Sequence, residues 1–213
     1  MSAREAVLGR IRRALVDVAD APPAQVDWEY AKPRPMDDVL EMFVERVVDY
    51  RAVMERCPAD QVGESIVKAL QANGVSSVVL PSGLDAAWRG AIEDAGIQIR
   101  DDDPQLSASQ LNEIDGVVTA AACGFAETGT IVLDHRPDQG RRALTLVPDV
   151  HVCVVRADQV VTDVPEGMAR LAEAIRDGQP LTWISGPSAT SDIELERVEG
   201  VHGPRILHAL LVV

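Results

Sequence analysis

The apolar residues in the first third of the chain repeat at helical spacing. Over residues 37–56 they recur every three or four positions, which predicts the clearest helix of the chain. Residues 59–72 continue the same period and predict a second helix. An earlier helix is predicted around Val7 and Ile11, and four prolines within residues 20–36 predict an extended connector behind it.

The spacing of apolar residues changes near residue 76, where short apolar runs alternate with helical segments. Continuous apolar runs are typical of strands buried on both faces, and strands that alternate with helices predict a parallel sheet. We therefore expect an α/β fold, an open and mostly parallel sheet flanked by helices, with an N-terminal helical extension. The extension and connector occupy residues 1–36, and the α/β domain occupies residues 37–213. The predicted strands are residues 76–81, 97–100, 116–121, 130–134, 151–156, 181–186 and 206–213, and the helices between them are residues 84–96, 107–112 and 165–177.

The composition narrows the range of partners. The formal net charge is -14, and an acidic surface repels a phosphate backbone, so binding of nucleic acid is disfavoured. No stretch approaches the roughly 18 consecutive apolar residues of a spanning helix, and the first residues lack the apolar run of a secretory signal. We therefore expect a cytoplasmic protein without a membrane span.

The cysteine pattern argues against a bound metal or cluster. Cys57, Cys123 and Cys153 form no C-x-x-C pair, which is unlike a disulfide framework, a zinc site or an iron–sulfur cluster held by one chain. Residues 101–103 offer three successive carboxylates, but like charges beside a proline are typical of a solvated loop. We expect no metal site and no cofactor in this chain.

A loop rich in glycine and threonine lies between two predicted strands. Its candidate ligand-binding residues are Gly124, Thr128, Gly129 and Thr130, because backbone N–H groups and hydroxyls can bind an anion. A phosphate-binding P-loop is excluded, since Thr130 replaces the lysine and a strand follows where a helix should begin. Glu127, the one carboxylate of this loop, is a candidate nucleophile or general base. A tight turn that needs glycine is the alternative interpretation.

The loops near the C-terminus carry the second group of candidates. Hydroxyl groups at the start of a predicted short helix could cap that helix or help it bind an anion. His202 stands between two glycines, and its imidazole could act as an acid or base near neutral pH. His151 starts a strand and His135 lies in a charged loop, and both could face solvent. The candidate ligand-binding residues here are Gly186, Pro187, Ser188, Thr190, Asp192 and Gly203, and His202 joins Glu127 as a catalytic candidate.

Four motifs carry a family resemblance. They are AETGT at residues 126–130, LVPDVH at 146–151, GPSATSDIE at 186–194 and GVHGP at 200–204. In this order, from about residue 37 to the end, they resemble the LUD-domain family and, within it, the lactate utilization C group.

The resemblance implies a fold and a role. The fold would be similar to that of the sugar-phosphate isomerase, glucosamine-phosphate deaminase and coenzyme A transferase group. The chain would be the cluster-free component of a system that oxidises L-lactate to pyruvate. Its partners would be two iron–sulfur lactate utilization proteins, which would hold the only clusters, and its substrate a small anion such as lactate.

Two other functions stay open on the sequence. A stand-alone enzyme on an anionic metabolite, such as a sugar phosphate or a coenzyme A ester, would use Glu127 and His202 in catalysis. A sensor would bind lactate without turnover. In each case we expect the loops that carry Glu127, Ser188 and His202 to converge on one pocket. Ala189 stands where many relatives have a larger basic residue, which weakens direct carboxylate binding there.

Overall fold

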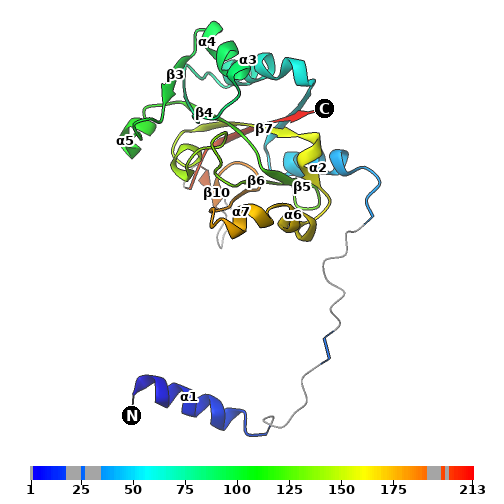
Figure 1. Ribbon diagram of the computed structural model, residues 1–213, viewed down its shortest axis with the longest axis vertical. Helices are drawn as coiled ribbons and strands as arrows, with labels where there is room; N and C mark the ends of the chain where they lie inside the picture. The colour runs from blue at the N-terminus through cyan, green and yellow to red at the C-terminus, as the bar shows by residue number, and fades with distance from the viewer. Residues whose placement is uncertain (1, 18–24, 27–34, 191–197, 200–201) are drawn as a thin grey trace. The chain divides into compact units, whose positions relative to one another are not determined.

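The structure, a computed structural model, describes residues 2–17, 25–26, 35–190, 198–199 and 202–213, and it divides into two units, residues 1–32 and 33–213. The first unit contains helix α1 (Ala3–Ala14), which begins with a capping box between Ser2 and Glu5. None of the α1 residues is buried. This helix confirms the predicted helical extension (Figure 1).

The second unit is built on a six-stranded sheet in which every neighbouring pair of strands is parallel. The strand order is β1-β12-β7-β4-β2-β3, and the central strands β7 and β12 are almost wholly buried. The strands are β1 (Val53–Cys57), β2 (Ser77–Leu80), β3 (Gln98–Asp101), β4 (Gly116–Ala120), β7 (Val150–Arg156) and β12 (Ile206–Val212). The predicted open parallel α/β fold is confirmed.

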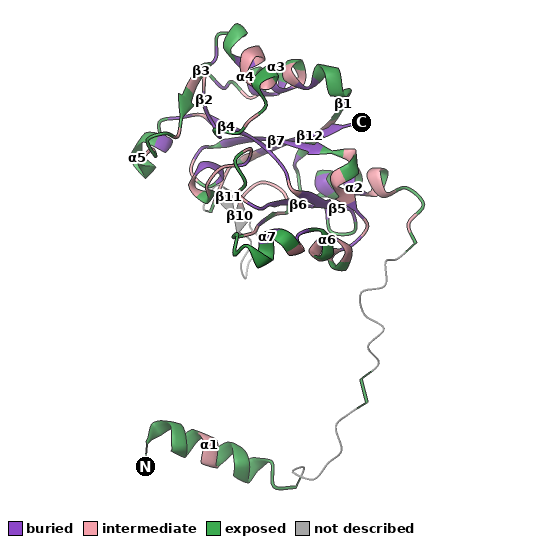
Figure 2. Cartoon of the chain, viewed as in Figure 1, coloured by how far each residue is buried: buried purple, intermediate pink, exposed green. Residues whose placement is uncertain are grey.

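Helices α3 (Val62–Ala72) and α4 (Ala86–Asp94) cover one face of this sheet, as Figure 1 shows. Their buried residues Ile66, Leu70 and Ile92 pack in one cluster with side chains of β2, β4, β7 and β12. The purple layer of Figure 2 follows this interface. The aliphatic side chains of the strands thus supply most of the core, in keeping with the low aromatic content.

A second, smaller sheet covers the opposite face together with helix α2 (Val39–Asp49). Its order is β8-β5-β6-β9, and β6 is antiparallel to both β5 and β9. Helices α6 (Val164–Arg170) and α7 (Ala172–Arg176) flank its outer side (Figure 1). The strands are β5 (Cys123–Phe125), β6 (Thr130–Leu133), β8 (Val160–Val161) and β9 (Thr182–Ile184). The prediction had placed β6 and β9 in the parallel sheet, which is wrong.

Two further sequence predictions are corrected. The helix predicted over residues 37–56 ends at Asp49, because Arg51 adopts a left-handed backbone conformation with φ 66° and β1 then pairs with β12. The short helix predicted after Ser188 is instead strand β10 (Ala189–Thr190), paired with β11 (Val198–Glu199). The remaining short elements are α5 (Ala108–Leu111) and three 3₁₀ turns, η1 (Ala59–Gln61), η2 (Arg142–Thr145) and η3 (Ala157–Gln159).

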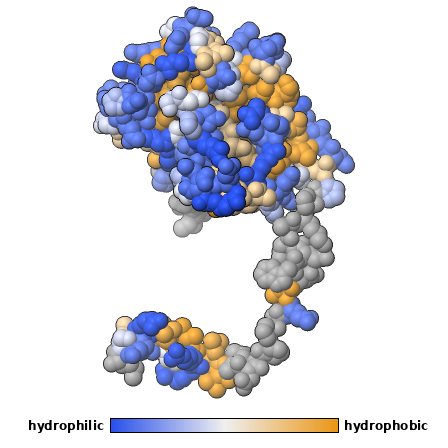
Figure 3. Space-filling view, viewed as in Figure 1, coloured by the Kyte–Doolittle hydropathy of each residue, from blue (hydrophilic) through white to orange (hydrophobic). Residues whose placement is uncertain are grey.

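The surface agrees with the acidic composition. The face of the second unit drawn in Figure 3 is mostly hydrophilic, with a smaller apolar region on it. Within the part of the chain that the structure describes, no helix combines the length and apolarity needed to cross a bilayer.

Candidate functional site

Two of the sequence motifs meet at a cavity of about 250 Å³ between the parallel sheet and the second sheet. We call it the inter-sheet pocket. Its wall combines strand β9, the turn after it, the loop before β12, and the amino ends of β7 and β12. The lining residues are Arg142, Thr145, His151, Thr182, Trp183, Ile184, Ser185, Gly186, Pro187, Ser188, His202, Gly203, Pro204 and Leu207. Five sequence candidates therefore lie together: Gly186, Pro187, Ser188, His202 and Gly203.

Backbone hydrogen bonds hold the two motif segments against each other. The Ser188 Oγ accepts a bond from the His202 N–H at 3.0 Å, and the Ser188 N–H donates to the Pro204 carbonyl at 2.8 Å. Gly186 has φ +82°, and a Cβ on it would lie 2.6 Å from the Tyr50 Cβ. A larger residue could not make this turn, so the glycine shapes the pocket mouth. His202 itself is exposed.

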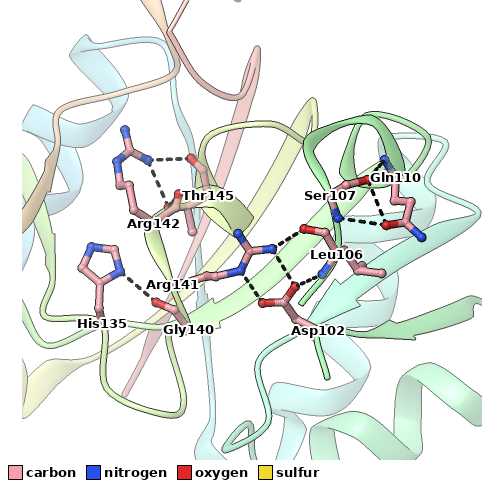
Figure 4. Close-up of polar contacts among 9 residues, drawn as sticks. All are labelled: Asp102, Leu106, Ser107, Gln110, His135, Gly140, Arg141, Arg142 and Thr145. Atoms are coloured by element: carbon pink, nitrogen blue, oxygen red, sulfur yellow. Dashed lines mark hydrogen bonds and ion pairs between the residues drawn. The ribbon is translucent and has the colours of Figure 1, made fainter. Parts of the chain in front are cut away.

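Arg142 places a positive charge in this wall, and the sequence analysis missed it. It belongs to η2, and its Nη1 donates to the Thr145 carbonyl at 3.1 Å and to the Thr145 Oγ1 at 3.2 Å (Figure 4). No carboxylate among the described residues forms an ion pair with it. Partial burial lowers the pKa of its guanidinium, although the side chain is accessible to solvent. A bound anion can therefore pair with it.

His151 is the second residue of the pocket that the sequence analysis misjudged. It is fully buried at the start of β7, not solvent-facing, and its Nε2 lies 2.8 Å from the Thr119 Oγ1. Burial, and then the positive charge of Arg142, lower the pKa of His151 to about 3. The imidazole is therefore neutral at pH 7, and its Nδ1 is the ring nitrogen left for a ligand.

His135 is fixed beside the pocket, not turned to solvent. Its Nδ1 lies 2.8 Å from the Gly140 carbonyl (Figure 4). Its Nε2 lies 2.7 Å from the Thr182 Oγ1. Because a carbonyl oxygen can only accept, Nδ1 carries the proton and Nε2 accepts from the Thr182 hydroxyl. This arrangement holds Thr182, a lining residue of the pocket, in one orientation.

The loop that carries Glu127 does not line the inter-sheet pocket. Glu127 and Thr128 are exposed and lie in a separate surface hollow with Arg46, Asp49 and Tyr50. Thr130 connects the Glu127 hollow to the wall of the inter-sheet pocket. Its Oγ1 lies 2.8 Å from the Thr128 Oγ1 and 2.9 Å from the Ser185 Oγ. The structure thus places the Glu127 hollow next to the pocket wall but outside the pocket.

The glycines of that loop allow helix α2 to pack closely against it. A Cβ on Gly124 would lie 2.9 Å from the Phe43 ring, and one on Gly129, which has φ +57°, would lie 2.6 Å from the backbone of Arg46. For Thr190 the structure gives the backbone within β10, and Asp192 lies outside the described residues.

Cys123 and the acidic turn at residues 101–103, the other groups with possible chemistry, have structural roles. Burial raises the pKa of Cys123 to about 11, which leaves the thiol protonated and a poor nucleophile. Within the acidic turn, Asp101 pairs with Arg89 at 2.8 Å and Asp102 pairs with Arg141 at 2.6 Å.

The fold and the pocket define an α/β protein with a small cavity between two sheets, whose described lining includes Arg142, His151, His202 and two glycine turns. The sequence model of the LUD domain matches residues 36–212, and the chain belongs to this family. The motif resemblance is thereby confirmed.

The chain is similar to curated proteins and to one solved structure over most of its length. It is 44% identical to lactate utilization protein C of Deinococcus radiodurans, over 97% of this chain and 93% of that protein. It is 27% identical to lactate utilization protein C of an Exiguobacterium species, over 98% and 95% of the two chains. The crystal structure of a DUF162 family protein from Deinococcus radiodurans matches with a TM-score of 0.71 and 39% identity, covering 85% of this chain and 100% of that chain.

Proposed function

We propose that this protein acts in lactate utilization and binds a small 2-hydroxy or 2-keto acid in the inter-sheet pocket. Relatives that match almost all of both chains bear the name lactate utilization protein C. The observation that carries the proposal is the Arg142 guanidinium, which lines a cavity of about 250 Å³ without a carboxylate partner among the described residues. A cavity of this size fits a small acid and not a drug-sized ligand.

The pocket residues take separate parts of such a ligand. Arg142 holds the carboxylate, because a guanidinium offers parallel N–H donors to two carboxylate oxygens. Neutral His151 offers its Nδ1 to the 2-hydroxyl group. Arg142 supplies a cation to this pocket from a different segment, so the missing basic residue at Ala189 does not prevent carboxylate binding.

The finer role that we propose is the cluster-free component of L-lactate oxidation. Conversion of lactate to pyruvate releases two electrons, the hydroxyl proton and the proton on C2. The electrons would pass to two iron–sulfur partner proteins and the C2 proton to water. His202 lies on the exposed rim of the pocket, where it could accept the hydroxyl proton. Glu127 lies outside this pocket, so a catalytic role for it belongs to the alternative of a stand-alone enzyme.

The binding proposal is tested by calorimetry with L-lactate, pyruvate and, as an uncharged comparison, lactamide. We expect the two acids to bind and lactamide not to bind. In Arg142→Met, affinity for the acids should fall about 10- to 100-fold, because a hydrogen bond to a charged group contributes about 1.5–3 kcal/mol. Arg176→Met is the matched control, since Arg176 is exposed on α7 and outside the pocket. Equal acid binding in both variants would contradict the assignment.

The finer role is tested in lactate-grown cells. An affinity-tagged chain should recover two iron–sulfur proteins and a lactate-dependent reductase activity. His202→Asn should retain both proteins but lose most of that activity. Recovery of neither partner would remove the proposed role and leave the binding result standing.

A further inference from the structure

A second, larger cavity lies at the carboxyl edge of the parallel sheet. The chain runs from β2 outward to β3 and then returns across β2 to β4, so the strand order reverses at this point. In open parallel sheets, ligands bind outside the carboxyl ends of the strands at such a reversal. A crevice of about 920 Å³ opens beside this reversal, at the carboxyl ends of β2 and β3. We call it the carboxyl-edge crevice.

The crevice has an apolar wall. Pro137 and Pro180 are the exposed apolar residues of this wall, and the buried side chains of Leu80, Pro81 and Leu144 lie beneath its surface. A volume of about 920 Å³ is more than three times that of the inter-sheet pocket. An organic ring fits this combination of apolar surface and size, whereas a three-carbon acid would leave most of it filled with water.

Four arginines line the same crevice in a chain whose net charge is -14. Two of them are already committed to structure. Arg141 donates to both carboxylate oxygens of Asp102, at 2.6 and 2.8 Å, and to the Leu106 carbonyl at 2.6 Å (Figure 4). Arg89 donates to both oxygens of Asp101, at 2.8 and 3.3 Å. These bidentate pairs fix the walls and neutralise most of the acidic turn.

The other two arginines are less fully paired, although Arg136 keeps its pair with the buried Asp134 and only its pair with Glu173 is open to exchange. Arg142 has no ion pair with a described carboxylate. Arg136 pairs with Asp134 at 3.1 Å and with Glu173 at 3.6 Å, and the Glu173 side chain is 70% exposed. Exposed pairs of this kind contribute little, so a dianionic group can replace Glu173 at low cost.

From this arrangement we infer that the carboxyl-edge crevice binds an organic phosphate of nucleotide size. Its phosphate lies between Arg136 and Arg142, and its ring lies against Pro137 and Pro180. Arginine suits this role because its planar fork matches the geometry of phosphate oxygens. Asp103 and Gln105 line the crevice as well and offer acceptors for hydroxyl or amino groups of the ligand.

The two cavities share a wall. Arg142 lines both of them, and His135 of the crevice accepts a hydrogen bond from Thr182 of the inter-sheet pocket. A phosphate that draws Arg142 toward the crevice weakens its hold on a carboxylate in the pocket. Coupling between two binding sites is reciprocal, so the phosphate ligand and the small acid should each lower the affinity of the other by the same factor.

The test is calorimetric titration of the full chain with AMP, ADP, FMN and NADH, with inorganic phosphate and adenosine for comparison. We expect at least one nucleotide to bind and adenosine not to bind. Two variants should each lower the affinity for that nucleotide at least 10-fold. Arg136→Gln removes a phosphate contact, and Ser82→Tyr fills the crevice from an exposed turn. Arg176→Gln removes the same charge outside the crevice and should change nothing.

Binding of L-lactate separates this site from the proposed function. Arg136→Gln and Ser82→Tyr lie outside the inter-sheet pocket, so both should retain lactate affinity, which also shows that they are folded. If none of the four nucleotides binds, or if binding survives both variants, the crevice site is overturned whether or not lactate binds.

Discussion

At the scale of single residues, His151 shows how a site can be built from a core position. Its side chain is 1% exposed, and it is the second residue of β7. The imidazole contacts Thr119 and lines the inter-sheet pocket. Arg142 approaches the same pocket from η2. A neutral imidazole next to a guanidinium avoids repulsion between two positive charges and leaves the arginine free to pair with an anion.

The lowered pKa of His151 makes stability depend on pH. The unfolded chain binds a proton on this histidine below about pH 6.5, whereas the native chain does so only near its folded pKa of about 3. Between these values the unfolded state holds more protons, so the free energy of unfolding falls as the pH is lowered, by up to about 1.4 kcal/mol per pH unit. The contribution is fully present above pH 6.5.

Urea unfolding between pH 4.5 and 7.5 measures this dependence. We expect His151→Gln, which keeps a polar partner for Thr119 but cannot titrate, to show a smaller slope than the native chain. Some slope should remain, because burial also lowers the pKa of His208 despite the opposing effect of Glu55. Identical slopes in the two proteins would show that His151 is not held neutral by the fold.

At the scale of elements, two helical glycines have opposite surroundings. A Cβ on Gly167 of α6 would overlap the Phe125 ring, which is buried and packs edge-on against Trp183 at 5.1 Å. A Cβ on Gly90 of α4 would meet nothing within 4 Å. Gly167→Ala should therefore lower the free energy of unfolding by about 1–3 kcal/mol through overpacking. Gly90→Ala should raise it by about 0.5–1 kcal/mol, since alanine is the better helix former.

Denaturant unfolding of the two variants checks this pair directly. Because each substitution adds the same methyl group to a helix, the intrinsic helix preference cancels between them. The difference reports the packing of α6 on the second sheet. Equal effects of the same sign would mean that Phe125 moves away from α6 without cost.

The apolar pattern predicted most of the parallel sheet, because strands buried on both faces leave a continuous apolar run in the sequence. It could not place β1, since Val53 and Met54 also continue the helical spacing of α2 and only the pairing with β12 decides between the two. It could not separate the second sheet either. The glycine-rich segment of β5 lacks the signature of a strand, and its pairing with β6 and β8 is a tertiary property.

Part of the lining of the candidate pocket could be predicted from short motifs, and part of it depends on the fold. The turn at Gly186 and the loop at His202 were visible because glycine, proline and serine cluster in them. Arg142 stands in an ordinary polar segment. Its position in the pocket wall follows only from where the fold places η2. The sequence could not place Glu127, whose loop contacts the turn at Ser185 through Thr130 but lies outside the inter-sheet pocket.

At the scale of the whole molecule, the distribution of buried residues separates the two units. The four hydrophobic clusters consist entirely of residues from Met36 onward among those the structure describes. Helix α1 has 12 residues and buries none of them. Isolated helices shorter than roughly 12–15 residues are marginal in water, so propensity and its capping box alone give α1 little stability.

A fragment of residues 33–213 should therefore unfold cooperatively, with a thermal midpoint within about 2–4 °C of the full chain, the shift that about 1 kcal/mol produces at this size. It should also keep the affinity for L-lactate, because all the described residues that line the inter-sheet pocket come from Arg142 onward. Conversely, a peptide of residues 1–32 should show low helicity by circular dichroism. Differential scanning calorimetry and lactate titration of the fragment make the comparison. A broad transition, or a loss of lactate affinity, would show that the first unit contributes to the folded body, and the boundary near residue 33 would then not be a domain boundary.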